Sequence, residues 1–156
     1  MSRMIRFHQF GAADVLKLEE LPTPKPGFGE VLLRTQALGV SWKDVLWRQN
    51  LGHTAAQLPA GLGHELAGTV LAVGAGVDDL SVGDRVASFP GHNANRYPAY
   101  AEQVVLPRSS LTRYPDNLTP QQASVHYVPS LVGWLGFVEL ANLQPGETVL
   151  VTAASR

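Results

Sequence analysis

The sequence contains no cysteine among its 156 residues. Disulfides, thiolate-bound zinc and a thiol nucleophile are therefore all excluded. Charge is also scarce, since 12 Lys and Arg against 13 Asp and Glu give a formal net charge of −1. Because binding to nucleic acid needs clustered positive charge, we expect no nucleic-acid partner.

Long hydrophobic runs are missing as well. No stretch reaches the roughly 18 consecutive apolar residues that would indicate a membrane span. The longest candidate, residues 124–143, is interrupted by His126, Pro129 and Glu139. The first eight residues lack the apolar run of a signal peptide. We therefore expect a soluble, cytoplasmic protein with no membrane partner.

The first two-thirds of the sequence are typical of short β-strands separated by turns. Hydrophobic residues make up 45% of the chain, which is enough for one globular domain with a short extension. The pattern predicts strands at residues 4–7, 15–21, 30–39, 66–73 and 100–106, and loops at 50–62 and 91–98. In the strand at 30–39 the period of two places Val31, Leu33, Thr35 and Ala37 on one face.

Two segments have helical features. Ser41 is a good N-cap with Asp44 three residues later, which predicts a short helix over residues 41–49. A second helix is expected to start at Thr119, with Pro120 in its first position, and Pro129 should break or kink it. After a turn at 142–147, residues 148–152 have the pattern of a buried strand.

Three motifs occur in a fixed order. The first is the proline-rich segment 22–29 leading into a strand, and the second is Gly63-His64-Glu65, which runs on to Val82-Gly83-Asp84-Arg85-Val86. The third is Leu143-Gln144-Pro145-Gly146-Glu147 followed by the apolar run at 148–152. Together they resemble the medium-chain dehydrogenase/reductase superfamily, which includes zinc alcohol dehydrogenases and zinc-independent quinone oxidoreductases.

This resemblance implies a fold that is mainly β with short helices. Residues 1–122 would form a GroES-like, partly open β-barrel, the catalytic domain. Residues 123–156 would supply a connecting helix and the first strand of an incomplete Rossmann domain, because the glycine-rich phosphate turn of that domain is not in the sequence. The implied cofactor of a full-length family member is NADPH or NADH.

Zinc is not expected. The zinc enzymes of the superfamily use a cysteine, the histidine of Gly-His-Glu and a third cysteine or acidic residue. The matching positions here are Ser41, His64 and Val128. Since a catalytic zinc requires three protein ligands plus water, one remaining ligand predicts no metal site.

The resemblance also assigns candidate site residues. Asp44 would orient His64, and this pair would serve either in proton relay or only as an inherited structural contact. Ser41 would donate its hydroxyl to a substrate carbonyl or simply cap the helix. Val132 lies where many relatives have a threonine beside the nicotinamide, so it is the candidate cofactor contact. Glu65 is expected to be structural.

Four aromatic residues, Trp42, Trp47, Tyr97 and Tyr100, would either line a pocket for flat substrates or belong to the core. The other histidines, His8, His53, His92 and His126, show no ligand spacing to one another.

The leading prediction is the substrate-side domain of an NAD(P)H-dependent oxidoreductase that reduces a small-molecule carbonyl, enone or quinone without catalytic zinc. The alternatives are a zinc-dependent alcohol dehydrogenase and a non-enzymatic GroES-like binding module. Exposed apolar surface on residues 131–140 and 148–152 further predicts self-association, or disorder beyond about Gln144.

Overall fold

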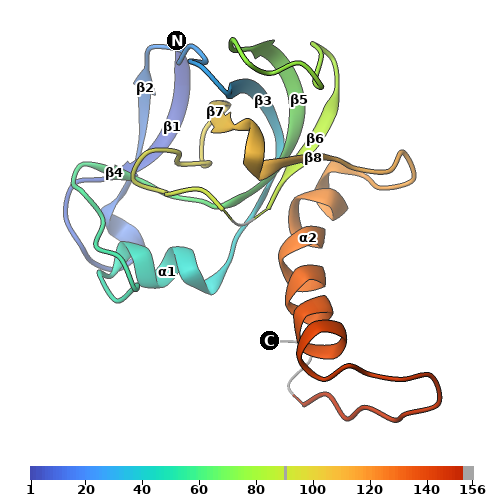
Figure 1. The fold of residues 1–156 in the computed structure, drawn as a ribbon. Helices are drawn as coiled ribbons and strands as arrows, with labels where there is room; N and C mark the ends of the chain where they lie inside the picture. Colours follow the sequence, from blue (N-terminus) through green and yellow to red (C-terminus); the bar gives the residue numbers. More distant parts are fainter. Residues whose placement is uncertain (90, 153–156) are drawn as a thin grey trace.

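The computed structural model describes residues 1–89 and 91–152, and Figure 1 shows the chain path. The strands are β1 (Ser2–Phe7), β2 (Leu16–Leu21), β3 (Glu30–Gly39), β4 (Ala60–Gly61), β5 (Glu65–Val73), β6 (Arg85–Ser88), β7 (Gln103–Pro107) and β8 (Leu111–Arg113). The helices are α1 (Trp42–Arg48) and α2 (Pro120–Trp134). Short 3-10 turns lie at Ala13–Val15 and Arg108–Ser110, and a π-helix at Leu135–Leu140 continues α2. The expected mainly β fold with short helices is confirmed.

The strands form two antiparallel sheets. One has the order β2-β1-β4 and the other β7-β3-β5-β6-β8. The sheets meet where β1 passes the segment before β7: the Ile5 N–H donates to the Tyr100 carbonyl at 2.9 Å, and the Glu102 N–H donates to the Arg3 carbonyl at 3.0 Å. Figure 1 shows the two sheets curling around a common interior, with α1 across one end.

The core forms on the predicted face of β3. Val31 and Leu33 are fully buried and pack with Leu66, Val70 and Leu106 from the neighbouring strands. The register of β3 with β5 shifts at two places, between Leu32 and Leu33 and between Thr35 and Ala37.

Gly68 allows the close approach of β5 to β3. A Cβ at this position would lie 2.4 Å from the Arg34 carbonyl oxygen, which is too close for any side chain.

Several predicted boundaries are wrong. The expected loop at 50–62 contains β4, and the strand expected at 100–106 starts only at Gln103. The reason is pairing across the sheet junction, because the carbonyls of Tyr100 and Leu62 accept hydrogen bonds outside any regular ladder. Strand β8, which the sequence did not indicate, forms because Leu111 can pair with Ser88 at the edge of the sheet.

Helix α2 has the predicted cap. The Gln122 N–H donates to the Thr119 hydroxyl at 3.2 Å, and the Thr119 N–H donates to the Gln122 side chain at 2.9 Å. Pro129 does not break the helix, which continues to Trp134. The Ser130 hydroxyl donates to the His126 carbonyl at 2.7 Å, one turn earlier in the helix.

The strand predicted at residues 148–152 is wrong. These residues have no regular structure, and Leu150 is 88% exposed. A strand needs a neighbour for its N–H and carbonyl groups, and no strand of the described residues lies beside this segment.

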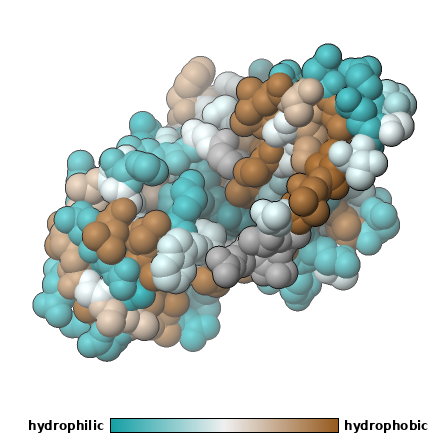
Figure 2. Space-filling model, turned by 90° about the horizontal axis from the view of Figure 1, so that it is seen from below, coloured by the Kyte–Doolittle hydropathy of each residue, from teal (hydrophilic) through white to brown (hydrophobic). Residues whose placement is uncertain are grey.

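Much of the C-terminal segment is exposed and apolar, including Leu131, Val132, Trp134, Leu135 and Leu140. Figure 2 shows these hydrophobic side chains gathered on the protruding helical part. Within residues 1–89 and 91–152, no helix is long and apolar enough to cross a membrane.

Candidate functional site

The Asp44 carboxylate is the centre of the candidate site. It lies in the first turn of α1 and its side chain is almost fully buried. One oxygen, Oδ1, lies 3.2 Å from Nδ1 of His64. The other, Oδ2, accepts hydrogen bonds from the Ser41 N–H at 3.0 Å, the Ser41 hydroxyl at 3.2 Å and the Tyr100 hydroxyl at 3.0 Å. The structure therefore contains the His–carboxylate contact that the sequence suggested.

These hydrogen bonds keep the Asp44 carboxylate ionised. Burial by itself would raise the pKa of Asp44, but the bonds from His64, Ser41 and Tyr100 outweigh burial and lower it below its ordinary value. Burial and the nearby Asp44 charge raise the pKa of Tyr100, so its phenol stays neutral and donates. The site thus holds an ionised acid at the end of α1, with His64 positioned by it.

His64 lies at the junction of two cavities. The larger, about 570 Å³, lies between α1 and the loops at 51–54 and 91–94. The smaller, about 50 Å³, is lined by Lys43, His64, Glu65, Gly91, His92 and Val128. Because Nδ1 of His64 is directed to Asp44, the opposite side of its ring is the part available to a molecule in these cavities.

His92 is a site residue that the sequence did not reveal. Its ring centroid lies 6.0 Å from that of His64, and both of its nitrogens are buried without a hydrogen-bond partner among the described residues. Burial, with smaller contributions from His64 and Lys43, lowers the pKa of His92 to about 4. The two histidines are 28 positions apart and come from different segments, so no local spacing could have linked them.

Two other predicted site residues do not line these cavities, although Ser41 contacts Asp44. Ser41 caps α1 and lines neither of these cavities, and Val132 is exposed on α2, 68% accessible.

Of the four aromatic residues considered for a pocket, Trp47 lines the larger cavity, and Trp47 and Tyr100 belong to a buried hydrophobic cluster. Trp42 is on the solvent side of α1, Tyr97 donates to Glu30 at 2.7 Å, and the Tyr100 hydroxyl is taken by Asp44.

The residues around His64 do not fit a zinc ion. Val128 lines the small cavity at the position where the zinc enzymes have their last ligand, and its side chain has no donor atom. Within the described part of the chain, no group of three His, Cys, Asp or Glu residues is arranged to hold a metal. Glu65 is buried beside this cavity, and burial together with the Asp44 charge raises the pKa of its carboxyl group, which weakens it as a ligand.

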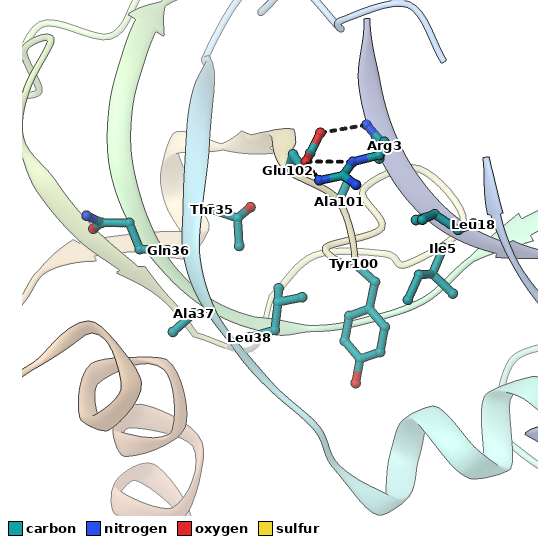
Figure 3. A pocket seen from close by; sticks show the side chains of 10 residues that line it. All are labelled: Arg3, Ile5, Leu18, Thr35, Gln36, Ala37, Leu38, Tyr100, Ala101 and Glu102. Atoms are coloured by element: carbon teal, nitrogen blue, oxygen red, sulfur yellow. Dashed lines mark hydrogen bonds and ion pairs between the residues drawn. The ribbon is translucent and has the colours of Figure 1, made fainter. Parts of the chain in front are cut away.

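A third cavity, about 450 Å³, opens between β1 and β3 (Figure 3). The Arg3 guanidinium is paired with Glu102 at one side, and the Tyr100 ring lies at the other with its hydroxyl directed away toward Asp44. The Thr35 hydroxyl is buried there with no partner in the described part of the chain. Arg3 and Glu102, the charged residues of this cavity, neutralise each other. We therefore place the candidate reactive groups in the two cavities that His64 lines.

The two curled sheets, the capped helix across their end and the Gly-His-Glu turn beside it define a GroES-like domain of the oxidoreductase type. The family model for the alcohol dehydrogenase GroES-like domain matches residues 27–116. The chain therefore belongs to this family, within the medium-chain dehydrogenase/reductase superfamily.

Individual relatives agree with this assignment. The chain is 36% identical to the rat synaptic vesicle membrane protein VAT-1 homolog, over 94% of this chain and 35% of that protein. It is 36% identical to a Pseudomonas aeruginosa quinone oxidoreductase, over 99% of this chain and 46% of that protein.

Solved structures give the same result. The Pseudomonas syringae quinone oxidoreductase matches with a TM-score of 0.83 at 34% identity, covering 94% of this chain and 44% of that chain. A mycobacterial protein complexed with NADPH matches with a TM-score of 0.80 at 31% identity, covering 94% of this chain and 43% of that chain. The chain spans less than half the length of these relatives.

Proposed function

We propose that the chain is the substrate-side domain of an NAD(P)H-dependent oxidoreductase that reduces a carbonyl, enone or quinone without catalytic zinc. Residues 1–122 would be the catalytic domain, and residues 123–156 the connection to a dinucleotide-binding domain. The observation that carries the proposal is the Asp44–His64 pair at the edge of the 570 Å³ cavity. The relatives named quinone oxidoreductase and the NADPH complex of a similar protein support it.

Reduction of such a substrate needs a proton donor near the oxygen on which negative charge develops. NADPH or NADH supplies the hydride when bound. The free side of the His64 ring can donate a proton to the substrate oxygen, and the contact with Asp44 holds the ring in position for this transfer.

Ser41 and Tyr100 act through Asp44 in this proposal. Both hydroxyls donate to Oδ2, so the carboxylate cannot rotate away from His64. Ser41 and Tyr100 are therefore positioning residues. For Ser41 we favour this role over direct donation of a hydrogen bond to the substrate.

The described residues contain no phosphate-binding turn, so we assign none of them to the dinucleotide phosphates. The possible contact from this chain is Val132, whose exposed side chain on α2 would meet the nicotinamide side of a second domain. No step of the proton transfer depends on this contact.

Ligand binding tests the proposal on the chain itself. Duroquinone and cyclohexenone, titrated into the isotope-labelled chain, should shift the NMR signals of His64 and of the Trp47 indole, which line the cavity. The exposed Trp42 and Trp134 indoles serve as internal controls. If neither molecule moves the cavity signals, the chain is not a substrate-binding domain of this class.

The alternative of a zinc enzyme is tested separately. Stoichiometric zinc in the purified chain, retained after dialysis, would replace the zinc-independent proposal.

A further inference from the structure

The larger cavity has an unusual charge pattern. Its lining residues are Lys43, Leu46, Trp47, Leu51, Gly52, His53, Thr54, His64, Gly91, His92, Asn93 and Ala94. None of these twelve is a carboxylate, while one lysine and three histidines are among them. A largely apolar wall whose one full charge is the ammonium group of Lys43 suits a small organic molecule that carries negative charge.

Two carboxylates, Asp44 and Glu65, lie near the larger cavity without lining it. Both oxygens of Asp44 are occupied by hydrogen bonds from His64, Ser41 and Tyr100 behind the cavity. Glu65 lies only in the smaller adjoining cavity, where burial and the Asp44 charge raise the pKa of its carboxyl group, while the nearby His64 and Lys43 act in the opposite direction.

Lys43 is the full positive charge at this site. It is exposed in the first turn of α1, and it forms no salt bridge with any carboxylate of residues 1–89 and 91–152. Lys43 and His64 both line the larger and the smaller cavity. A molecule with one oxygen at His64 therefore has the ammonium group beside it for a second group.

The two loops of the cavity wall are tied together by Asn95. Its side-chain oxygen accepts the Gln57 N–H at 2.7 Å, and its side-chain nitrogen donates to the Ala55 carbonyl at 3.1 Å. The Asn93 side-chain oxygen accepts the Asn95 N–H at 2.9 Å, which fixes the side chain of a residue that lines the cavity. The polar groups are thus held in place before a ligand arrives.

We propose that this cavity selects substrates with an anionic group, a carboxylate or a phosphate, close to the reducible carbonyl or enone, and that Lys43 pairs with the anion. The inference rests on the proposed function, because it places the reducible group at His64. Lys43 is accordingly a specificity-determining residue.

The test compares matched probes on the 156-residue chain. Phenylglyoxylate, its neutral methyl ester and phenyl phosphate are titrated while the His64 and Trp47 signals are followed by NMR. The anionic keto acid should bind about fivefold more tightly than its ester, as expected for one partly exposed charge pair. The phosphate probe shows which of the two anions the cavity prefers.

Three variants assign the effect. Lys43→Met should reduce the affinity for phenylglyoxylate to that for the ester, whereas Lys43→Arg should retain most of it. Lys25→Met is the matched control, since Lys25 is exposed in the proline-rich loop and lines none of the described cavities.

Two results overturn the inference in different ways. If the ester binds as tightly as the acid, or if Lys43→Met leaves the preference intact, the anionic class is wrong and the proposed function stands. If no probe moves the cavity signals, the proposed function fails with it.

Discussion

Replacing His92 by leucine should change how the stability of the protein depends on pH. The pKa of His92 is lowered from 6.5 to about 4, first by burial and then by His64 and Lys43. As pH falls below 6.5, the unfolded chain binds a proton at this histidine while the folded chain does not. As far as His92 is concerned, the folded state is therefore most stable above pH 6.5, and its free energy of unfolding decreases progressively as pH falls toward 4.

The size of the change in stability follows from the pH range over which the unfolded chain is protonated at His92 and the folded chain is not. Each pH unit inside it changes the free energy of unfolding by about 1.4 kcal/mol, so the two units from 6.5 to 4.5 set an upper limit of about 2.8 kcal/mol. Partial protonation of the folded state near pH 4.5 reduces this to about 2 kcal/mol. His92→Leu should remove that part of the pH dependence, so the variant gains relative to the natural sequence as pH falls.

Urea denaturation followed by tryptophan fluorescence at pH 7 and pH 4.5 measures the difference. Other acidic groups titrate in both proteins, so only the change between the two proteins is attributed to His92. An NMR titration of the His92 ring gives an independent value. Equal pH dependence in the two proteins, together with a ring midpoint near 6.5, would refute the reasoning.

Three further predictions concern the site, the core and the surface. Asp44→Asn should lower the free energy of unfolding by about 1–3 kcal/mol at pH 7, because buried donors lose a charged acceptor. Since the pKa of Asp44 is lowered in the folded state, this difference should vanish as pH falls through that value, below 3.8. Leu33→Ala should cost about 2–5 kcal/mol by urea denaturation, because Leu33 is fully buried, whereas Leu18→Ala on the exposed side of β2 should cost less than about 0.5 kcal/mol. Leu140→Ser should weaken concentration-dependent self-association in sedimentation velocity, since Leu140 is 76% exposed on the apolar C-terminal patch; unchanged association would place the contact elsewhere.

Most elements of the fold could be predicted from local patterns in the sequence. The alternation at β3, the cap residues Ser41 and Thr119 and the punctuating glycines each act within a few residues, so they could be recognised without a structure. The short strand β4 and the edge strand β8 were missed because their partners, Arg6 to Phe7 and Val86 to Ser88, are distant in sequence. Such strands exist through pairing rather than through their own pattern.

The sequence by itself established the lack of thiolate ligands, and its resemblance to the superfamily indicated the family and the pairing of Asp44 with His64. The tertiary structure alone decided that Tyr100 reaches the same carboxylate and that His92 lies beside His64. It also decided that residues 148–152 stay without regular structure, despite an apolar pattern that predicts a strand. In each case the outcome depends on a partner that is distant in the sequence. A hydrogen bond, a buried contact or the pairing of two strands needs two segments, whereas a local pattern describes only one of them.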